Sequence, residues 1–118
     1  MHVDVDATLR VEADATLRVD ALFIHPVKAC RAVPVQAAEL LSTGLCHDRE
    51  FMIVDENGMF LTQRECPTLA RLAATAGDAA LSLCGDDGRV VEVPYDTEGP
   101  AVLVEIWGDK VEATDCGA

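Results

Sequence analysis

The sequence predicts an all-β fold: a small closed or partly open β-barrel of about seven to nine short strands, with at most one short helix. Three observations support this prediction. Apolar and polar residues alternate over several segments, short clusters of Gly, Asp and Asn separate them, and half of the 118 residues are hydrophobic while only 4% are aromatic. A chain of this length forms one domain around one core. We expect that core to include Ile53, Val54, Leu61, Leu83, Val93, Val104 and Trp107.

The amino-terminal segment alternates most strictly. Every odd position from Val3 to Phe23 is apolar, and the even positions up to Asp20 are polar or charged. This period of two predicts a half-buried strand. The sequence DATLRV occurs twice, at 6–11 and at 14–19. Because an even offset keeps the same side chains on the same face, the copies could compete for one position in the sheet. We favour a short duplication that lengthened the amino terminus.

The sequence predicts the structure of the next two segments with unequal clarity. Residues 33–45 combine a short extended piece with a possible helical turn and end at Gly44–Leu45. Residues 49–63 predict a β-hairpin: Phe51 and Ile53 mark one strand, 55–58 supply a turn ending in Asn-Gly, and 59–62 return antiparallel.

The carboxy-terminal half predicts a meander. Residues 68–76 are rich in alanine and have helical propensity, but the alternating segments on either side of the turn at 86–88 favour strands. Residues 101–115 then predict two strands about Gly108–Asp109, with Trp107 and Cys116 in core and strand-end packing.

The charge balance excludes several classes of partner. The formal net charge is -12, whereas a phosphate-binding face needs an excess of Lys and Arg. We therefore expect no nucleic acid and no anionic membrane as a partner. No apolar run is long enough for a transmembrane helix, and no basic segment precedes an apolar run as in a signal peptide. The expectation is a cytoplasmic protein that is monomeric in isolation.

The five cysteines lie 16, 20, 18 and 32 residues apart, with no CxxC pair. In a reducing compartment such cysteines are expected to be small buried hydrophobes with free thiols. Cys46 beside His47 suggests a metal site or a nucleophile. Neighbouring residues on a strand point to opposite faces, however, so we expect this pair not to share a site.

Four ordered stretches resemble one family: HPVKAC (25–30), GLCHDREFMIVDENGMFLTQR (44–64), WGD (107–109) and DCG (115–117). In order and spacing they resemble the amino-terminal β-barrel domain of MOSC proteins, which include the mitochondrial amidoxime reducing components and their bacterial relatives. The resemblance covers residues 17–118. Residues 1–16, with the first repeat copy, lie outside it and are assigned to an amino-terminal extension.

The resemblance implies a cofactor site. In family members with both domains, the lysine of the P-V-K stretch and the arginine of the D-R pair approach the pterin and phosphate of the molybdenum cofactor (molybdopterin), which places those roles on Lys28 and Arg49. A planar fork and a point charge suit such an anion. Family sequences often have serine after the lysine; Ala29 stands here and could donate only its backbone N–H. Arg64 could reach the mouth of the cofactor site.

Each of these residues also has a simpler interpretation. Residues 28–71 carry five Lys or Arg against six Asp or Glu, a net charge of -1, and the other 74 residues carry four against fifteen, a net charge of -11. This near-neutral band fits an anionic ligand. Lys28 could equally be a solvated loop cation, Arg49 could form a surface ion pair, and Arg64 could protect an edge strand against aggregation.

In the family, the molybdenum-ligating cysteine belongs to the carboxy-terminal MOSC domain, and none of the five cysteines lies in that motif. Three hypotheses therefore stay open. The chain is an accessory barrel that needs a MOSC domain in cis or in trans, which by resemblance would reduce N-hydroxylated compounds; or a stand-alone binding or interaction module; or a small thiol or metal-binding β protein. Under the first, we expect neither catalysis nor a tightly bound cofactor from this chain alone.

Overall fold

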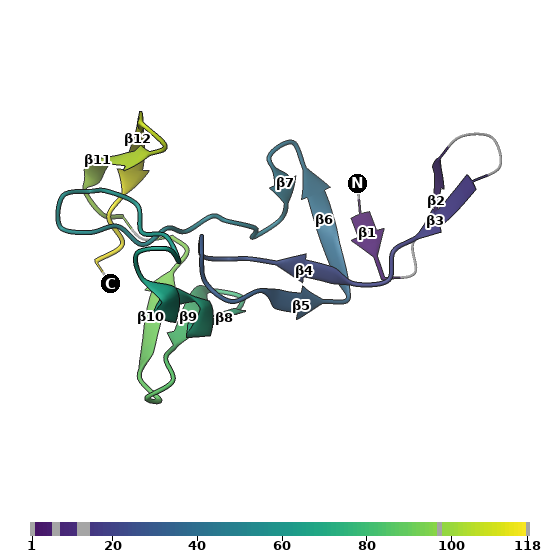
Figure 1. The fold of residues 1–118 in the computed structure, drawn as a ribbon, viewed down its shortest axis with the longest axis horizontal. Coiled ribbons are helices and arrows are strands. Elements are labelled where there is room, and N and C mark those ends of the chain that lie inside the picture. Colours follow the sequence, from purple (N-terminus) through teal and green to yellow (C-terminus); the bar gives the residue numbers. More distant parts are fainter. Residues whose placement is uncertain (1, 6–7, 12–14, 97, 118) are drawn as a thin grey trace.

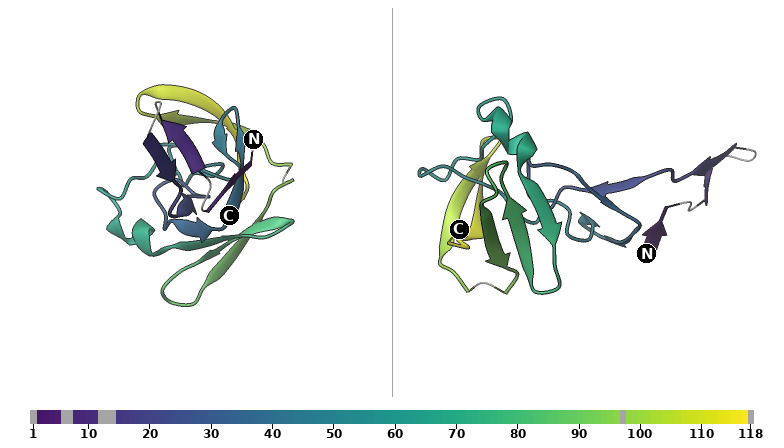
Figure 2. Two further views of the ribbon diagram at one scale, coloured as in Figure 1. Left: turned by 90° about the vertical axis from the view of Figure 1, so that its right-hand side faces the viewer. Right: turned by 90° about the horizontal axis from the view of Figure 1, so that it is seen from below.

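The computed structural model describes residues 2–5, 8–11, 15–96 and 98–117 and confirms the all-β prediction. The described residues form twelve short strands and one 3-10 helix (Figure 1). The molecule is elongated, with extents of 52 × 34 × 30 Å. One end holds the core and the carboxy-terminal strands, and a hairpin near the amino terminus projects at the other end (Figures 1 and 2).

The amino-terminal segment forms four short strands and not the one long strand predicted. They are β1 (His2–Asp4), β2 (Thr8–Val11), β3 (Ala15–Arg18) and β4 (Leu22–Ile24). The inward face was also predicted wrongly, because Leu17 and Phe23 are more than half exposed while Ile24 is buried. Alternation specifies which side chains share a face but neither the length of a strand nor which face is covered.

The two repeat copies pair with each other. Strands β2 and β3 are antiparallel, with Leu9 opposite Leu17 and Val11 opposite Ala15. In both copies the apolar residues occupy odd-numbered positions, so this antiparallel pairing places apolar positions opposite one another. The possible competition for one place in a sheet is thus resolved by pairing of the copies. Strand β1 hydrogen-bonds to β6 and links the extension to the rest of the chain.

Residues 33–45 are extended, and the possible helical turn is absent from this described segment. Strand β5 (Val33–Val35) pairs with β4, while β6 (Ala37–Leu41) lies between β1 and β7 (Gly44–Leu45). Pro34 disfavours helical backbone at the residue before it. Gly44 has φ of +124°, which lets the chain reverse between β6 and β7.

The predicted hairpin at 49–63 is present as a tight turn with little regular strand. Val54 and Phe60 form an antiparallel bridge, and the backbone N–H of Leu61 donates to the carbonyl oxygen of Ile53 at 3.1 Å. Asp55 Oδ1 accepts the backbone N–H groups of Asn57 and Met59 at 2.8 and 3.0 Å. This turn chemistry is of the kind that the sequence predicts.

The meander and the last hairpin are confirmed. After the 3-10 helix η1 (Pro67–Arg71), the strands β8 (Ala73–Ala76), β9 (Ala80–Cys84) and β10 (Val90–Pro94) form one antiparallel sheet. Strands β11 (Ala101–Ile106) and β12 (Asp109–Thr114) form a two-stranded ribbon. Among the described strands, no backbone ladder joins this ribbon to the β8–β9–β10 sheet, so the barrel is partly open.

The core lies between the 27–30 turn, η1 and the β8–β9–β10 sheet. Its buried members are Val27, Cys30, Leu69, Ala74, Leu81 and Val93. Of the predicted core residues, Val93 and Val104 are buried, Ile53, Leu61 and Leu83 are partly buried against the core, and Val54 is half-buried. The prediction for Trp107 is wrong: its side chain is 68% exposed at the turn between β11 and β12.

Candidate functional site

Two segments far apart in sequence form a short ladder that positions the candidate site. Val27 and Phe51 make a parallel bridge. The backbone N–H of Lys28 donates to the carbonyl oxygen of Phe51 at 2.9 Å, and Phe51 donates to that of Pro26 at 3.1 Å. Pro26 and Val27 are buried. The proline cannot donate to a sheet ladder, but its carbonyl accepts here, so the proline that follows β4 starts the ladder that carries Lys28.

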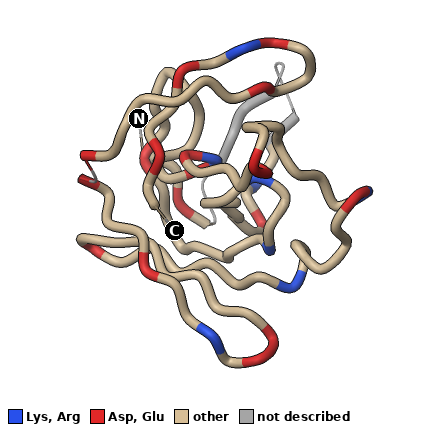
Figure 3. Tube along the Cα trace, turned by 90° about the vertical axis from the view of Figure 1, so that its left-hand side faces the viewer, with Lys and Arg blue, Asp and Glu red and all other residues tan. Residues whose placement is uncertain are grey.

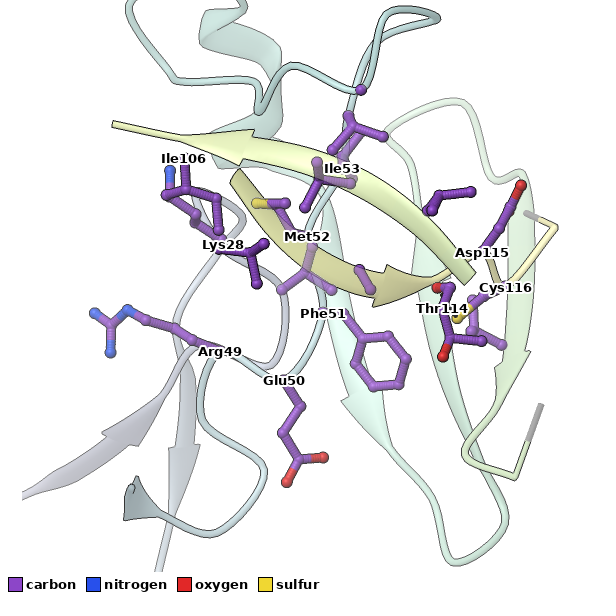
Figure 4. A pocket seen from close by; sticks show the side chains of 18 of the residues that line it. Lys28, Arg49, Glu50, Phe51, Met52, Ile53, Ile106, Thr114, Asp115 and Cys116 are labelled. Atoms are coloured by element: carbon purple, nitrogen blue, oxygen red, sulfur yellow. Dashed lines mark hydrogen bonds between the residues drawn. The ribbon is translucent and has the colours of Figure 1, made fainter. Parts of the chain in front are cut away.

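This ladder forms part of the wall of a cleft of ≈ 1210 Å³, compared with about 300–1,000 Å³ for typical small-molecule pockets. The wall also includes His47, residues 52–58, parts of β9 and β10 with Tyr95, and parts of β11 and β12 with residues 115–117. Lys28 and Arg49 both line the cleft, and they lie at the opposite end of it from Asp115 and Cys116 (Figure 4).

Lys28 is half-buried, and its ammonium group faces aromatic rings. Its Nζ lies 4.4 Å from the centre of the Phe60 ring and 5.7 Å from that of Trp107. Those two rings contact each other at 4.9 Å. Cation–π contact of this kind holds an ammonium group without neutralising it. The exposed Trp107 thus belongs to the surroundings of Lys28, which sequence reasoning missed.

The backbone of Arg49 is held by a hydrogen bond, and its side chain is largely exposed. Its backbone N–H donates to the carbonyl oxygen of His25 at 2.6 Å, and its φ is +53°. The side chain is 58% exposed and pairs with Asp48, which also accepts the backbone N–H of His25 at 2.7 Å. The surface ion pair considered for Arg49 is therefore present, and exposed pairs of this kind are weak.

The structure does not bring the other two predicted residues into the cleft wall. Ala29 lies in the turn after Lys28 with φ of +69°, and its carbonyl accepts from Gln63 Nε2 at 2.8 Å. Arg64 is exposed in the loop before η1. Neither lines the cleft. A cofactor contact for Ala29 and Arg64 stays a prediction.

The cleft wall is mixed in charge. Two cations line it together with the carboxylates of Glu50, Asp55, Glu56 and Asp115. Acidic positions are also spread around the face of the molecule that Figure 3 shows. An anionic ligand would therefore be favoured only at the Lys28–Arg49 end.

The turn at residues 46–50 gathers side chains that we expected to stay apart. Cys46, His47 and Glu50 each offer one ligand atom, and these atoms all lie within 4.8 Å of one another. The strand geometry on which that expectation rested is absent, because Cys46 and His47 lie in a turn in which His47 has φ of +64°. In a left-handed turn the rule that neighbours face opposite sides does not apply. The sequence CHDRE (46–50) was the signal from which this turn could have been predicted.

Tyr95 packs beside this turn. Its ring stacks on His47 at 5.4 Å and contacts Phe51 at 6.0 Å. Its hydroxyl is buried and has no hydrogen-bond partner among the described residues. Burial raises the pKa of the Tyr95 phenol, and Glu50, Asp78 and Cys46 raise it further, because nearby negative charge disfavours ionisation.

In the described part of the chain, no helix has the length and apolarity to cross a bilayer.

Comparison with known proteins identifies relatives of this chain. The chain is 33% identical over 102 residues to the mitochondrial amidoxime-reducing component 1 of Xenopus laevis, covering 81% of this chain and 30% of that protein. It is 38% identical over 104 residues to the molybdenum cofactor sulfurase of Drosophila grimshawi, covering 81% and 14%.

The chain therefore spans less than a third of either relative. No solved structure matches it significantly. The family model described as the MOSC N-terminal beta barrel domain matches residues 16–118, which is nearly the whole sequence and includes all four motifs. The matched region also contains Lys28, Arg49 and the cleft. The chain belongs to the MOSC N-terminal beta barrel domain family.

Proposed function

We propose that this barrel is an accessory domain that supplies cations to an anionic molybdenum-cofactor site and needs a carboxy-terminal MOSC domain, in cis or in trans, for catalysis. The observation that carries the proposal is the position of Lys28 and Arg49. They are 21 residues apart in sequence, yet the 25–28 and 48–51 segments are hydrogen-bonded so that both side chains line one end of one cleft.

The donor set at this end fits a phosphate-bearing pterin. Lys28 offers a point charge that its aromatic neighbours hold but do not neutralise, and Arg49 offers a planar fork whose ion-pair partner among the described residues is Asp48, with the two side chains 58% and 19% exposed. An incoming phosphate can replace that contact at little cost. When bound, the cofactor would supply the redox-active metal centre that the side chains of this chain lack.

Exposed apolar residues support a covering partner. Leu103, Trp107 and Val111 of the β11–β12 ribbon are 66%, 68% and 42% exposed. Leu103 and Val111 also line the cleft. Apolar surface gathered beside a cleft is typical of an interaction site. A MOSC domain packed there would close the cleft over the Lys28–Arg49 end.

The relatives' names suggest the chemistry of the complete protein. One is an amidoxime-reducing component, so we propose reduction of N-hydroxylated compounds as the reaction of the two-domain assembly. The sulfurase relative makes handling of the molybdenum cofactor itself the second candidate. A cytoplasmic location stays a prediction, since one relative is named as mitochondrial.

Charge reversal in the two-domain assembly tests the proposed role. We expect Lys28→Glu and Arg49→Glu each to lower cofactor retention, measured as molybdenum per assembly after gel filtration, by about tenfold, which corresponds to about 1.4 kcal/mol. The matched control is Arg89→Glu, because Arg89 is 88% exposed in the turn between β9 and β10 and does not line the cleft. Unchanged retention in both cleft variants would return Lys28 and Arg49 to solvated surface cations.

A further inference from the structure

The turn at Cys46–Glu50 holds three metal-ligand side chains on an anchored backbone. The N–H of Cys46 donates to the carbonyl of Glu39 in β6 at 2.8 Å. Glu50 lies between Arg49 and Phe51, whose N–H groups bind the 25–26 segment. His47 stands between them with φ of +64°. The ligand atoms are therefore carried by a turn that is hydrogen-bonded on both sides.

The spacing of the ligand atoms is close to what a metal ion requires. His47 Nδ1 lies 3.2 Å from Glu50 Oε2, and the thiol sulfur completes a set within 4.8 Å. Around a tetrahedral zinc ion with bonds of about 2.0–2.3 Å, neighbouring ligand atoms are separated by roughly 3.3–3.8 Å. The imidazole–carboxylate pair, at 3.2 Å, is already close to this separation, and a side-chain shift on the order of 1 Å brings in the sulfur.

We propose that Cys46, His47 and Glu50 form a binding site for a divalent transition-metal ion, with zinc as the ion that best fits one thiolate, one imidazole and one carboxylate. This donor set excludes Mg²⁺ and Ca²⁺ as preferred ions, because they favour oxygen ligands. Three protein ligands leave a fourth tetrahedral position for water or another small ligand. The site goes beyond the proposed cofactor role and does not depend on it.

The contacts of His47 and Glu50 show how the metal-free turn is held. The His47 backbone N–H donates to Glu50 Oε1 at 3.2 Å, and His47 Nδ1 hydrogen-bonds to Glu50 Oε2. A cation bound at Nδ1 would take the place of the second hydrogen bond, with the imidazole proton then carried by Nε2, and thiolate ligation would displace the proton of Cys46. The imidazole is oriented by stacking on Tyr95, whose buried hydroxyl has no hydrogen-bond partner in the part of the chain that the structure describes.

The proposed metal site opens onto the cleft. His47 and Glu50 line the cleft that Lys28 and Arg49 line, and both side chains are a little under half exposed. A metal ion bound there would be accessible from solvent and from any ligand in the cleft.

The test is titration of the reduced, metal-free 118-residue chain with Co²⁺ and Zn²⁺ in the presence of excess Mg²⁺, which saturates unspecific binding to the acidic surface. We expect one equivalent of Co²⁺ to bind with a thiolate-to-cobalt charge-transfer absorption band, and one equivalent of Zn²⁺ to abolish that band. Calorimetry of the Zn²⁺ titration measures the affinity.

Three variants remove the ligands singly: Cys46→Ser, His47→Asn and Glu50→Gln. Asn tolerates the left-handed backbone at position 47 and can still hydrogen-bond to Glu50. Each variant should lose more than the about 10–100-fold in affinity that loss of an outer-sphere partner typically costs. Cys84→Ser and Glu56→Gln are the matched controls, and both should bind as the parent chain does.

Several outcomes overturn the proposal. They are the absence of stoichiometric binding, binding without the charge-transfer band, and equal losses in the ligand and control variants. If Cys46→Ser does not fold, His47→Asn and Glu50→Gln decide, because both side chains are near half-exposed and neither belongs to the core cluster.

Discussion

Arg49 donates its backbone N–H to the carbonyl oxygen of His25 at 2.6 Å. The return contact runs from the backbone N–H of His25 to Asp48 Oδ1 at 2.7 Å. The position of Arg49 in the cleft is therefore set by its backbone, while its side chain stays available. The proline-ended strand and the D-R pair are one structural unit.

Removing the Asp48 carboxylate should loosen this unit. We expect Asp48→Ala to lower the free energy of unfolding by about 1–3 kcal/mol, because it leaves the part-buried His25 N–H without its acceptor. Asp48→Asn keeps an acceptor oxygen and should recover most of the loss. Urea unfolding measures both. Equal losses in the two variants would mean that the charge of Asp48, and not its bond to His25, holds the ladder.

Gly58 should be more sensitive to alanine than Gly88. Both have positive φ, +78° and +81°, so alanine costs about 1–2 kcal/mol of backbone strain at either position. A Cβ on Gly58 would also lie 2.9 Å from the carbonyl oxygen of Leu103, whereas a Cβ on Gly88 meets nothing within 4 Å. The difference in unfolding free energy between Gly58→Ala and Gly88→Ala isolates that close approach. No difference would show that the 55–58 turn does not pack tightly on β11.

Stability should fall as the solution becomes alkaline, in part through Cys30. Burial raises the pKa of the Cys30 thiol, so the folded state keeps its proton when the unfolded state has lost it. The contribution of Cys30 is therefore complete at neutral pH and declines as pH rises above about 8.5, the ordinary pKa of a cysteine. Between pH 7 and about 10, the free energy of unfolding should fall less steeply with pH for Cys30→Ala than for the parent chain. Cys84→Ala controls for loss of a half-buried thiol, and identical slopes for Cys30→Ala and the parent chain would contradict the prediction.

Trp107 should report on the surroundings of Lys28. It is the one tryptophan in the sequence and is 68% exposed, so we expect red-shifted emission that acrylamide quenches readily. Lys28→Met removes the ammonium group near the ring and should change the emission intensity, whereas Lys110→Met should not. Blue-shifted, protected emission in the isolated chain would restore the core position that the sequence predicted.

Local signals in the sequence predicted the parts of the fold that local chemistry decides. The turn at 55–58, the meander of β8–β10 and the β11–β12 hairpin each have their own turn residues between alternating segments. The four strands of the amino-terminal segment were not predictable, because alternation contains no information on where a strand stops or which partner it takes. The pairing of the two repeat copies is a choice among registers of similar pattern.

The candidate site was predictable only in part. Lys28 and Arg49 were identified as site residues from the family resemblance. The backbone hydrogen bonds that bring them to one cleft cannot be predicted from a sequence pattern. Trp107 was placed in the core because tryptophan is usually well covered, yet its left-handed backbone at a turn turns it outward beside Lys28. The Cys46–His47 pair was rejected as a shared site by a rule for strands, and the left-handed backbone of His47 made that rule inapplicable.

Reconstitution with a MOSC domain tests the central claim most directly. The purified chain, a separately expressed MOSC domain and an equimolar mixture are each incubated with molybdenum cofactor, an electron donor and a hydroxylamine-type substrate. Bound molybdenum and substrate reduction are then measured for all three. The account predicts that the chain alone retains no stoichiometric molybdenum and reduces nothing, and that the mixture exceeds the MOSC domain alone in both. Stoichiometric molybdenum and turnover in the chain alone would contradict it, and so would a mixture that behaves like the MOSC domain without the barrel.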